Sequence, residues 1–313
     1  MTNLAIQFEE AQPMSETDQI RAFLSNATFE VTPTQASKVE DFRDVLAEGT
    51  TVFVTFLPGS DFAETVKTVK KLHAEGMHPV PHLAARSIPS KAFLEENLKV
   101  LQGEAAVSEA LLIGGGVDNP VGEFDATIQV IRTGLLEKYG ITRLGVAGHP
   151  EGSPDIKDAD IAAALAEKNA YAKDTGTDMY ITTQFCFEAK PIIEWDQRIR
   201  AAGNELPIHI GVPGLATVKT LMKHAVACGI GNSMNFLRKQ AMNVTKLMVV
   251  NAPDRLVRDL AAYHATDPTC GIEVAHMYPL GGLKKTAAWT RAVQDGHFDL
   301  KSKGGFEVTV PIE

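Results

Sequence analysis

The sequence is poor in cysteine and has no long hydrophobic run. Its 313 residues include three cysteines, Cys186, Cys228 and Cys270, none of which has the Cys-x-x-Cys spacing of common zinc and redox sites. Isolated cysteines suit a reducing compartment better than a disulfide framework. No stretch approaches the roughly 20 apolar residues of a membrane span, and residues 1–14 lack the basic start of a secretion signal. We therefore expect a cytoplasmic protein with no membrane partner.

Positive charge is also in deficit. Thirty lysines and arginines face 39 aspartates and glutamates, which gives a formal net charge of -9 at pH 7. A nucleic acid would be repelled at long range by such a chain, so we expect a small-molecule ligand and no nucleic-acid partner. Assembly into a homo-oligomer is left open by the composition. The histidines show no ligand pairing on a predicted helix, and Pro150 separates His149 from Glu151, so we expect no catalytic metal.

Short apolar runs recur along the chain and alternate with helical patterns. With 44% hydrophobic and 22% charged residues, the composition is that of an ordinary globular protein. Alternating strands and helices predict parallel βαβ units, and about eight such units favour a single (β/α)8 TIM barrel over residues 1–313. A doubly wound sheet is the alternative. The predicted strands are residues 29–33, 51–57, 78–84, 109–115, 143–148, 178–185, 207–214 and 271–280.

Helices are predicted where apolar residues recur every three or four positions. The extensions have their own patterns: residues 1–26 predict an N-terminal helix, 231–268 extra helices between strands seven and eight, and 300–313 a C-terminal extension with a strand-like end. Ser60 or Asp61 is available to cap the second helix of the barrel. The apolar stripes are Val39, Phe42, Val45 and Leu46; Phe62, Val66, Val69 and Leu72; and Phe124, Ile128, Ile131 and Leu135.

Polar residues and glycines collect where the predicted strands end. The carboxyl ends of the strands in a TIM barrel meet at one face, where the chemistry takes place, so residues far apart in sequence are expected to line one cavity. The candidates are Glu30, Thr55, His82, Gly114, Gly115, Gly116, His149, Glu151, Gln184, Pro213, Gly214, His276 and Tyr278.

Three of these side chains have clear chemical potential. An acid in a buried strand tends to keep its proton, so Glu30 is either a general acid or a salt-bridged carboxylate inside the barrel. His82 either fills a barrel layer with both nitrogens satisfied, which the sequence alone favours, or lies against a planar cofactor. The Gln184 amide either pairs with the edge of a heterocyclic ligand or bonds neighbouring backbone.

The three glycines after the fourth strand lack side chains and can expose backbone amides to a ligand. The sequence "GGGVDN" does not have the spacing of a dinucleotide fingerprint, and it is equally typical of a tight loop. Asp118 and Asn119 either supply polar contacts at this lip or form the turn.

The ordered set of strand-end motifs resembles the methylenetetrahydrofolate reductase family, a TIM-barrel family that typically carries FAD. The similarity runs over residues 25–285, and the most specific motifs are "HPEGSPD" and "GTDMYITTQFCF". The matching segments are "FEVTP", "FVTF", "VPHLA", "LLIGGG", "AGHPEGSPD", "DTGTDMYITTQFCF", "IHIGVPGL" and "AHMYPL".

The resemblance implies reduction of 5,10-methylenetetrahydrofolate to 5-methyltetrahydrofolate with NAD(P)H, NADH being the expected form. Opening of the substrate's five-membered ring requires a proton on a ring nitrogen, and the resulting iminium carbon accepts a hydride. Glu30 matches the family's acid, for which a raised pKa would suit the role. Gln184 matches the glutamine that binds the pterin, and further substrate contacts are expected from Asp118, Phe187 and Tyr278.

The same resemblance implies cofactor contacts at Thr55, His82, Gly114, Gly115, Gly116, His149, Lys168 and Tyr171. Several of these positions depart from the family pattern. Gly114 and Gly116 replace an arginine and an aspartate, His149 replaces a tyrosine, and Ser153 replaces a histidine. Tyr171 and Ala172 stand where the family has basic residues, and its arginine after the eighth strand is missing. FAD is therefore the expectation from the family, while the chain's own residues support folate binding better than flavin binding.

Three rival functions remain, of which the first uses the same residues. The enzyme could run in the oxidising direction, the protein could be a non-catalytic folate-binding or methyl-carrier partner, or the barrel could be a metal-dependent aldolase. Replacement of Glu30, rates in both directions and metal analysis would separate them.

Overall fold

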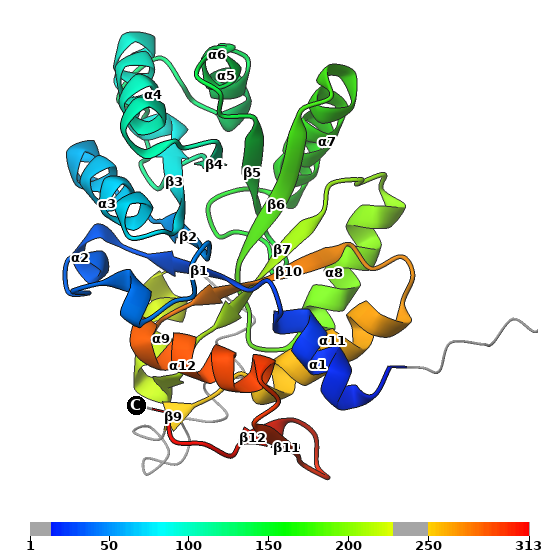
Figure 1. Cartoon of the computed structure of the whole chain (residues 1–313). Coiled ribbons are helices and arrows are strands. Elements are labelled where there is room, and N and C mark those ends of the chain that lie inside the picture. Colours follow the sequence, from blue (N-terminus) through cyan, green and yellow to red (C-terminus); the bar gives the residue numbers. More distant parts are fainter. Residues whose placement is uncertain (1–13, 228–249, 313) are drawn as a thin grey trace, which may run out of the picture.

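A computed structural model describes residues 14–227 and 250–312, and in this part of the chain eight parallel strands form a closed barrel (Figure 1). The predicted TIM barrel is confirmed, and closure excludes the doubly wound alternative. The barrel strands are β1 (Thr28–Val31), β2 (Thr51–Val54), β3 (His78–Ala84), β4 (Glu109–Ile113), β5 (Arg143–Gly148), β6 (Asp178–Phe185), β7 (Ile208–Pro213) and β10 (Ile272–Tyr278).

The order of the strands around the barrel follows the chain, with β1 pairing with β10 to close the circle. In that last pair Thr28 lies opposite His276 and Phe29 opposite Met277. Closure thus places two segments side by side that are almost 250 residues apart, since Thr28 and His276 differ by 248 positions.

The strands are apolar on both faces because each face is covered. Phe53, Val80, Leu111 and Tyr180 form a separate cluster inside the barrel. Their strand neighbours, such as Val52, pack outward in the main core between the barrel and its helices. This two-sided burial explains why the strands read as nearly continuous hydrophobic runs in the sequence.

The outer layer of helices matches the sequence patterns only in part. The helices that follow the barrel strands are α3 (Phe62–Ala74), α4 (Lys91–Ala105), α5 (Thr127–Ile131), α6 (Leu135–Lys138), α7 (Asp158–Thr175), α8 (Ala189–Ala201), α9 (Val218–Ala227), α11 (Asp254–Thr266) and α12 (Leu283–Gln294). Asp61 caps α3 by accepting a hydrogen bond of 2.9 Å from the backbone N–H of Ala63, as predicted.

Two predicted helices are wrong in extent. Over residues 39–46 the chain forms a 3-10 turn (Phe42–Asp44) in place of a helix, because the Asp41 side chain accepts the N–H of Arg43 and starts a new turn. The short helix α2 (Pro33–Ala36) precedes this segment. In the stripe from Phe124 to Leu135, Phe124 precedes α5, Ile128 and Ile131 lie on α5, and Leu135 begins α6. The two helices are separate because Gly134 takes a left-handed conformation with φ of 69°.

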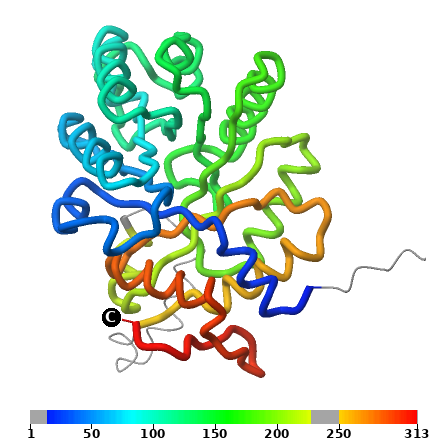
Figure 2. Tube along the Cα trace, viewed as in Figure 1, coloured from blue at the N-terminus to red at the C-terminus, as the bar shows by residue number. Residues whose placement is uncertain are grey.

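The first described helix lies beside the last ones. α1 (Glu16–Leu24) packs on α11 and α12, as the blue and orange segments of Figure 2 show. The guanidinium of Arg258 donates to the Glu16 carboxylate at 2.8 Å, and that of Arg21 donates to the carbonyl of Gln294 at 3.0 Å. These bonds support the barrel closure between β1 and β10.

The predicted extensions have a clear outcome only where the chain is described. The expected N-terminal helix is present as α1, whereas residues 1–13 lie outside the described chain. The C-terminal extension forms a hairpin of β11 (Phe298–Leu300) and β12 (Phe306–Val308). Of the extra helices predicted over 231–268, α11 is present and residues 231–249 lie outside the described part. A two-stranded ribbon, β8 (Ala216–Thr217) and β9 (Val250–Asn251), flanks this gap.

Candidate active site

Four strands bring one carboxylate and three of its neighbours together at the carboxyl-end half of the barrel. Glu30 on β1 accepts a hydrogen bond of 2.5 Å from the hydroxyl of Thr55, which follows β2. Its other oxygen lies 3.1 Å from Nε2 of His276 on β10 and 3.7 Å from Nε2 of His82 on β3. We call these residues the Glu30 cluster. The predicted meeting of Glu30, Thr55, His82 and His276 is confirmed.

His276 is the most enclosed member of the cluster. Its side chain has no exposed surface, and its Nδ1 lies 2.8 Å from the hydroxyl of Thr28, the residue opposite it across the barrel closure. The rings of Phe53 and Tyr278 pack edge-on against the imidazole at 4.5 and 4.9 Å. Both nitrogens therefore have defined partners, and the aromatic rings hold the plane of the imidazole.

The environment of Glu30 lowers its pKa, which corrects the expectation of a raised one. Burial alone would raise the pKa of this carboxyl, but the charge of His82 and the hydrogen bonds from His276 and Thr55 together lower it below its ordinary value. The sequence shows the burial of Glu30 but neither its two hydrogen-bond donors, His276 on β10 and Thr55 after β2, nor the charge of His82 on β3. In the resting site Glu30 is a hydrogen-bonded carboxylate.

His82 also differs from the interpretation that the sequence favoured. The side chain is buried, yet neither ring nitrogen has a hydrogen-bond partner among the described residues. Burial lowers the pKa of His82, opposed by the Glu30 charge. Since buried polar atoms are normally paired, two orphaned nitrogens beside Glu30 leave room for a polar ligand atom or a water molecule.

The loop after β4 offers backbone in place of charged side chains. Gly115 has φ of 94°, and a Cβ on Gly116 would lie 3.3 Å from the ring of Pro58. The loop is held against the preceding one by the backbone N–H of Arg86, which donates to the Gly114 carbonyl at 3.0 Å. Asp118, the nearest acid, is exposed. This lip supplies carbonyls and amides where the resemblance implies an arginine and an aspartate.

The loop after β5 contacts the strand that follows it. The Cys186 thiol donates to the Gln184 carbonyl at 3.8 Å. Burial together with the nearby Glu151 charge raises the pKa of that thiol well above its ordinary value. His149 is half-buried close to Lys168 of α7. Burial lowers the pKa of both His149 and Lys168. Tyr171 lies one turn further along α7 and is also half-buried.

A β-bulge presents Gln184 to solvent. The register between β6 and β7 shifts between Thr182 and Phe185, so that one extra residue of β6 fits against β7. Gln184 is exposed although both of its neighbours are buried. The bulge requires a glycine opposite it, because a Cβ on Gly211 would lie 2.5 Å from the Gln184 carbonyl oxygen.

An aromatic group lies beside this bulge. The hydroxyl of Tyr278 donates to the Thr183 carbonyl at 2.9 Å. The ring of Phe185 packs against Tyr278 at 5.2 Å and against Phe187 at 5.7 Å. Tyr278 also touches His276, so a contiguous surface links the Glu30 cluster to the Gln184 region.

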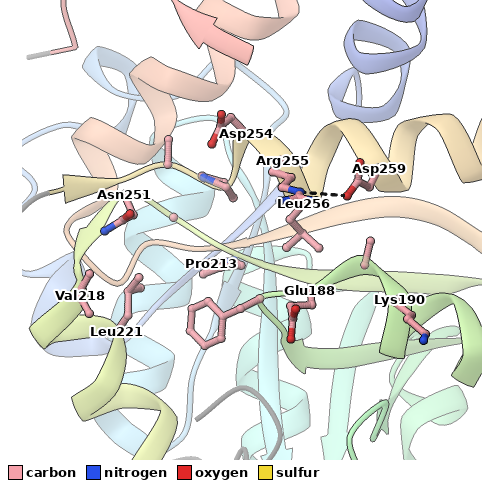
Figure 3. A pocket seen from close by; sticks show the side chains of 15 residues that line it. Glu188, Lys190, Pro213, Val218, Leu221, Asn251, Asp254, Arg255, Leu256 and Asp259 are labelled. Carbon is pink, nitrogen blue, oxygen red and sulfur yellow. Dashed lines mark ion pairs between the residues drawn. The ribbon is translucent and has the colours of Figure 1, made fainter. Parts of the chain in front are cut away.

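A cavity of about 370 Å³ opens outside this aromatic group (Figure 3). The start of α8, the end of β7, α9 and the start of α11 surround it. Figure 3 shows Pro213 and Leu221 on its apolar side and the ion pair of Arg255 with Asp259, 3.9 Å apart, at its rim. No member of the Glu30 cluster lines the cavity, so it lies beside the cluster and not over it.

The described residues at the lip of the barrel offer few positive charges to a flavin and no cluster of ligands to a metal ion. A flavin dinucleotide carries a diphosphate that favours cations or clustered backbone donors. Here Gly114 and Gly116 have no side chains, and Lys168 is the α7 lysine close to His149. These residues do not fit a tightly held flavin in the manner the family implies. In the described residues no group of three or more His, Cys, Asp or Glu could hold a metal ion, and no helix there is long and apolar enough to span a membrane.

Sequence reasoning missed Thr28 as a member of this site. Thr28 and Glu30 stand two apart on β1 and therefore face the same side of the strand. The two-residue period of a strand could have identified Thr28 from Glu30, but it does not show which residue of β10 lies opposite Thr28. His276 was placed among the strand-end residues without a role, and the structure makes it the link between the other two.

A closed barrel with a hydrogen-bonded carboxylate at the carboxyl-end half of its strands defines the class of TIM-barrel proteins with a strand-end site. Residues 25–239 match the sequence profile of the family described as methylenetetrahydrofolate reductase. The chain belongs to the methylenetetrahydrofolate reductase family, as its motifs predicted.

Individual relatives match over shorter stretches. The chain is 30% identical over 127 residues to methylenetetrahydrofolate reductase 2 of Saccharomyces cerevisiae, which covers 40% of this chain and 20% of the yeast protein. It is 31% identical over 111 residues to methylenetetrahydrofolate reductase 1 of Schizosaccharomyces pombe, and the match covers 35% of this chain and 17% of the S. pombe protein. The matched stretches thus span about a fifth of these relatives. A family 18 chitinase from Crocus vernus aligns with a TM-score of 0.36 and 12% identity over 60% of this chain and 80% of its own, a likeness too distant to bear on function.

Proposed function

We propose that this protein reduces 5,10-methylenetetrahydrofolate to 5-methyltetrahydrofolate with NAD(P)H, NADH being the expected donor. The observation that carries the proposal is the Glu30 carboxylate, held by Thr55 and His276 where a TIM barrel performs its chemistry. Membership of the family supplies the substrate class.

Each step of the reaction has a residue to perform it. Glu30 rests as a carboxylate, so it first takes up one proton from solvent. It transfers this proton to a ring nitrogen of the folate, the C–N bond breaks, and the cationic iminium accepts a hydride at its carbon. The exposed amide of Gln184 binds the pterin edge, and Phe187 and Tyr278 form the adjoining apolar wall. NAD(P)H supplies the hydride and is released as NAD(P)+.

Flavin is the cofactor expected from the family, and we route no step through it because the lip after β4 lacks the side chains that would hold it. Gly114, Gly115, Gly116, His149, Lys168 and Tyr171 remain the candidate contacts for whichever dinucleotide binds. A visible absorption spectrum of the purified protein tests this directly. Flavin bands at a stoichiometry near one would restore FAD to the mechanism.

The test of the function is NAD(P)H oxidation that depends on methylenetetrahydrofolate. Glu30→Gln keeps the shape of the side chain but removes the proton donor, so we expect kcat to fall by about 10²- to 10⁴-fold with the folate KM little changed. Glu137→Gln, an exposed acid on α6, is the matched control. No turnover by the wild-type protein, together with retained folate affinity, would favour the folate-binding or methyl-carrier alternative.

The oxidising direction uses the same residues, so rates with 5-methyltetrahydrofolate and NAD(P)+ decide the direction.

We further propose that the protein acts in the cytoplasm on a free folate, without a nucleic-acid or membrane partner, and the composition is compatible with a homo-oligomer. Size measurement in solution at several concentrations tests the oligomer.

A further inference from the structure

We propose that the guanidinium of Arg86, on the loop after β3, binds the diphosphate of the nicotinamide dinucleotide. The inference rests on the proposed function for the identity of the dinucleotide. It goes beyond that function by assigning the cation of the diphosphate site to a side chain on the loop beside the glycine lip.

Four contacts hold Arg86 against the loop after β4. The backbone N–H of Arg86 donates to the Gly114 carbonyl at 3.0 Å, and the Arg86 carbonyl accepts from the N–H of Val121 at 2.8 Å. Its side-chain Nε donates to the Asp125 carbonyl at 3.0 Å and lies 3.2 Å from the Asp125 carboxylate. We call these four residues the Arg86 clasp. The clasp joins both ends of the loop over residues 114–125 to one arginine.

The clasp leaves the outer edge of the guanidinium open. Nε is the only side-chain nitrogen of Arg86 that donates a hydrogen bond to a described residue, and the side chain is 36% exposed. The terminal nitrogens Nη1 and Nη2 therefore keep their N–H donors for a ligand. Because Nε already holds the side chain in place, little freedom is lost on binding, and the planar fork fits two phosphate oxygens at once.

Backbone donors lie beside this arginine. A Cβ on Gly115 would lie 3.9 Å from the Cβ of Arg86. The backbone N–H groups of Gly115, Gly116 and Val117 donate to no other described residue. Free amides in a turn bind anions, and a neighbouring guanidinium adds the positive charge that the glycines lack.

The distance between Arg86 and the Glu30 cluster suits one dinucleotide. His82 precedes Arg86 by four residues, so the two Cα atoms are at most about 14 Å apart. In the dinucleotide, one ribose separates the diphosphate from the nicotinamide ring that gives up the hydride. This arm and the Arg86 side chain can together span the distance, so that the diphosphate lies on the clasp while the nicotinamide lies over the folate.

The charges near this site identify Arg86 and one opposing group. Arg86 is the only arginine between residues 44 and 131, which include β2, β3, β4 and the loops that follow them. The Asp125 carboxylate, at the Nε edge, repels a diphosphate. One guanidinium does not reverse the net charge of -9, so Arg86 acts after encounter, by slowing dissociation of the dinucleotide.

Arg86→Met removes the charge and keeps most of the side-chain length. We expect the Kd of ADP-ribose, which carries the diphosphate without nicotinamide, to rise at least tenfold, because charge-assisted hydrogen bonds are lost. Arg86→Lys keeps the charge without the fork, and its Kd should rise about threefold. Arg291→Met, in the last turn of α12, is the matched control. Titration calorimetry measures each Kd without turnover, and circular dichroism shows that each variant folds.

Two further measurements separate a phosphate contact from support of the loop. In Arg86→Met, kcat/KM should fall at least tenfold for NADH and stay within twofold for reduced nicotinamide riboside, which carries no phosphate. Asp125→Asn keeps an acceptor for Nε and removes a negative charge, so the Kd of ADP-ribose should fall by about two- to fivefold. A rise in that Kd would show that the shape of the loop controls binding, and it would overturn the inference.

Equal ADP-ribose affinity in the wild type and Arg86→Met would also overturn the inference, as would equal losses for NADH and reduced nicotinamide riboside. A wild-type protein that binds ADP-ribose through Arg86 but does not turn over methylenetetrahydrofolate would overturn the proposed function alone.

Discussion

Individual side chains inside this barrel have pKa values that depend on partners from other strands. Glu30 is ionised because its donors outweigh its burial. His209 on β7 has no such donor: it is buried, stacked on Tyr180 at 4.0 Å, and neither ring nitrogen has a partner in the described chain. Burial, aided by the charges of His276 and Arg143, lowers the pKa of His209 from 6.5 to about 3. Two buried residues of one barrel thus respond to acid in different ways.

The His209 shift predicts a pH-dependent stability. Below pH 6.5 the unfolded chain binds a proton at this histidine and the folded protein does not. As the pH falls from roughly 6 to 4, His209 should therefore lower the free energy of unfolding by about 1.4 kcal/mol per pH unit. His209→Phe keeps the stack on Tyr180 and should remove this slope, as measured by urea unfolding at pH 7, 6 and 5. The exposed His297→Gln is the control, and equal slopes for wild type and His209→Phe would contradict the assignment.

At the scale of elements, the bulge in β6 determines where Gln184 lies. In a regular β6, Gln184 would lie on the same face of the strand as Tyr180, which is buried inside the barrel. The extra residue is accommodated because Gly211 on β7 has no side chain and its N–H bonds the Thr183 hydroxyl at 2.9 Å. A single glycine on β7 thus supports the position of Gln184 on β6, the residue for which we propose substrate binding.

Gly211→Ala should disturb this bulge and with it folate binding. The added Cβ would lie 2.5 Å from the Gln184 carbonyl, so backbone must shift, and we expect a loss of about 1–3 kcal/mol in the free energy of unfolding together with a raised folate KM. Gly103→Ala, in the last turn of α4, is the matched control. Its Cβ meets nothing within 4 Å, and the substitution should stabilise by up to about 0.5–1 kcal/mol. An unchanged KM in Gly211→Ala would show that the bulge does not position Gln184 for the substrate.

At the scale of the whole molecule, an acidic protein is expected to bind two anionic substrates. The net charge of -9 repels both the folate carboxylates and the dinucleotide diphosphate at long range. The field is felt over about 30 Å at 10 mM ionic strength and about 8 Å at 150 mM.

Salt should therefore accelerate substrate capture. We expect kcat/KM for NADH and for the folate to rise by up to severalfold between 10 and 150 mM salt, in assays in which kcat stays constant. Potassium chloride and sodium chloride at equal ionic strength should act alike, which excludes a specific ion. A decrease in kcat/KM with salt would instead show a local cationic path, with Lys168 as the first residue to replace.

The local sequence determined the strands, several helices and the places where polar residues would gather. The periodicity of strands and helices depends on residues that are close in sequence, so the sequence predicts where each strand ends. Because active residues of a TIM barrel lie at the strand ends, this predicted a set that included Glu30, Thr55, His82 and His276. The motifs also identified the family, which residues 25–239 then matched. Errors arose where a capping Asp41 or a left-handed Gly134 interrupted a helical stripe.

Only the tertiary structure decided the chemistry of the site. Thr28 meets His276 because β1 pairs with β10, and that pairing joins positions 248 residues apart that no local pattern relates. The lowered pKa of Glu30 follows from the charge of His82 on β3 and from hydrogen bonds donated by His276 on β10 and by Thr55 after β2. The exposure of Gln184 follows from a one-residue bulge against β7. Hydrogen-bond partners depend on barrel closure and register, whereas burial of a strand depends on its own residues. The sequence therefore predicted which residues would gather at the strand ends, and the closed barrel determined what each of them touches.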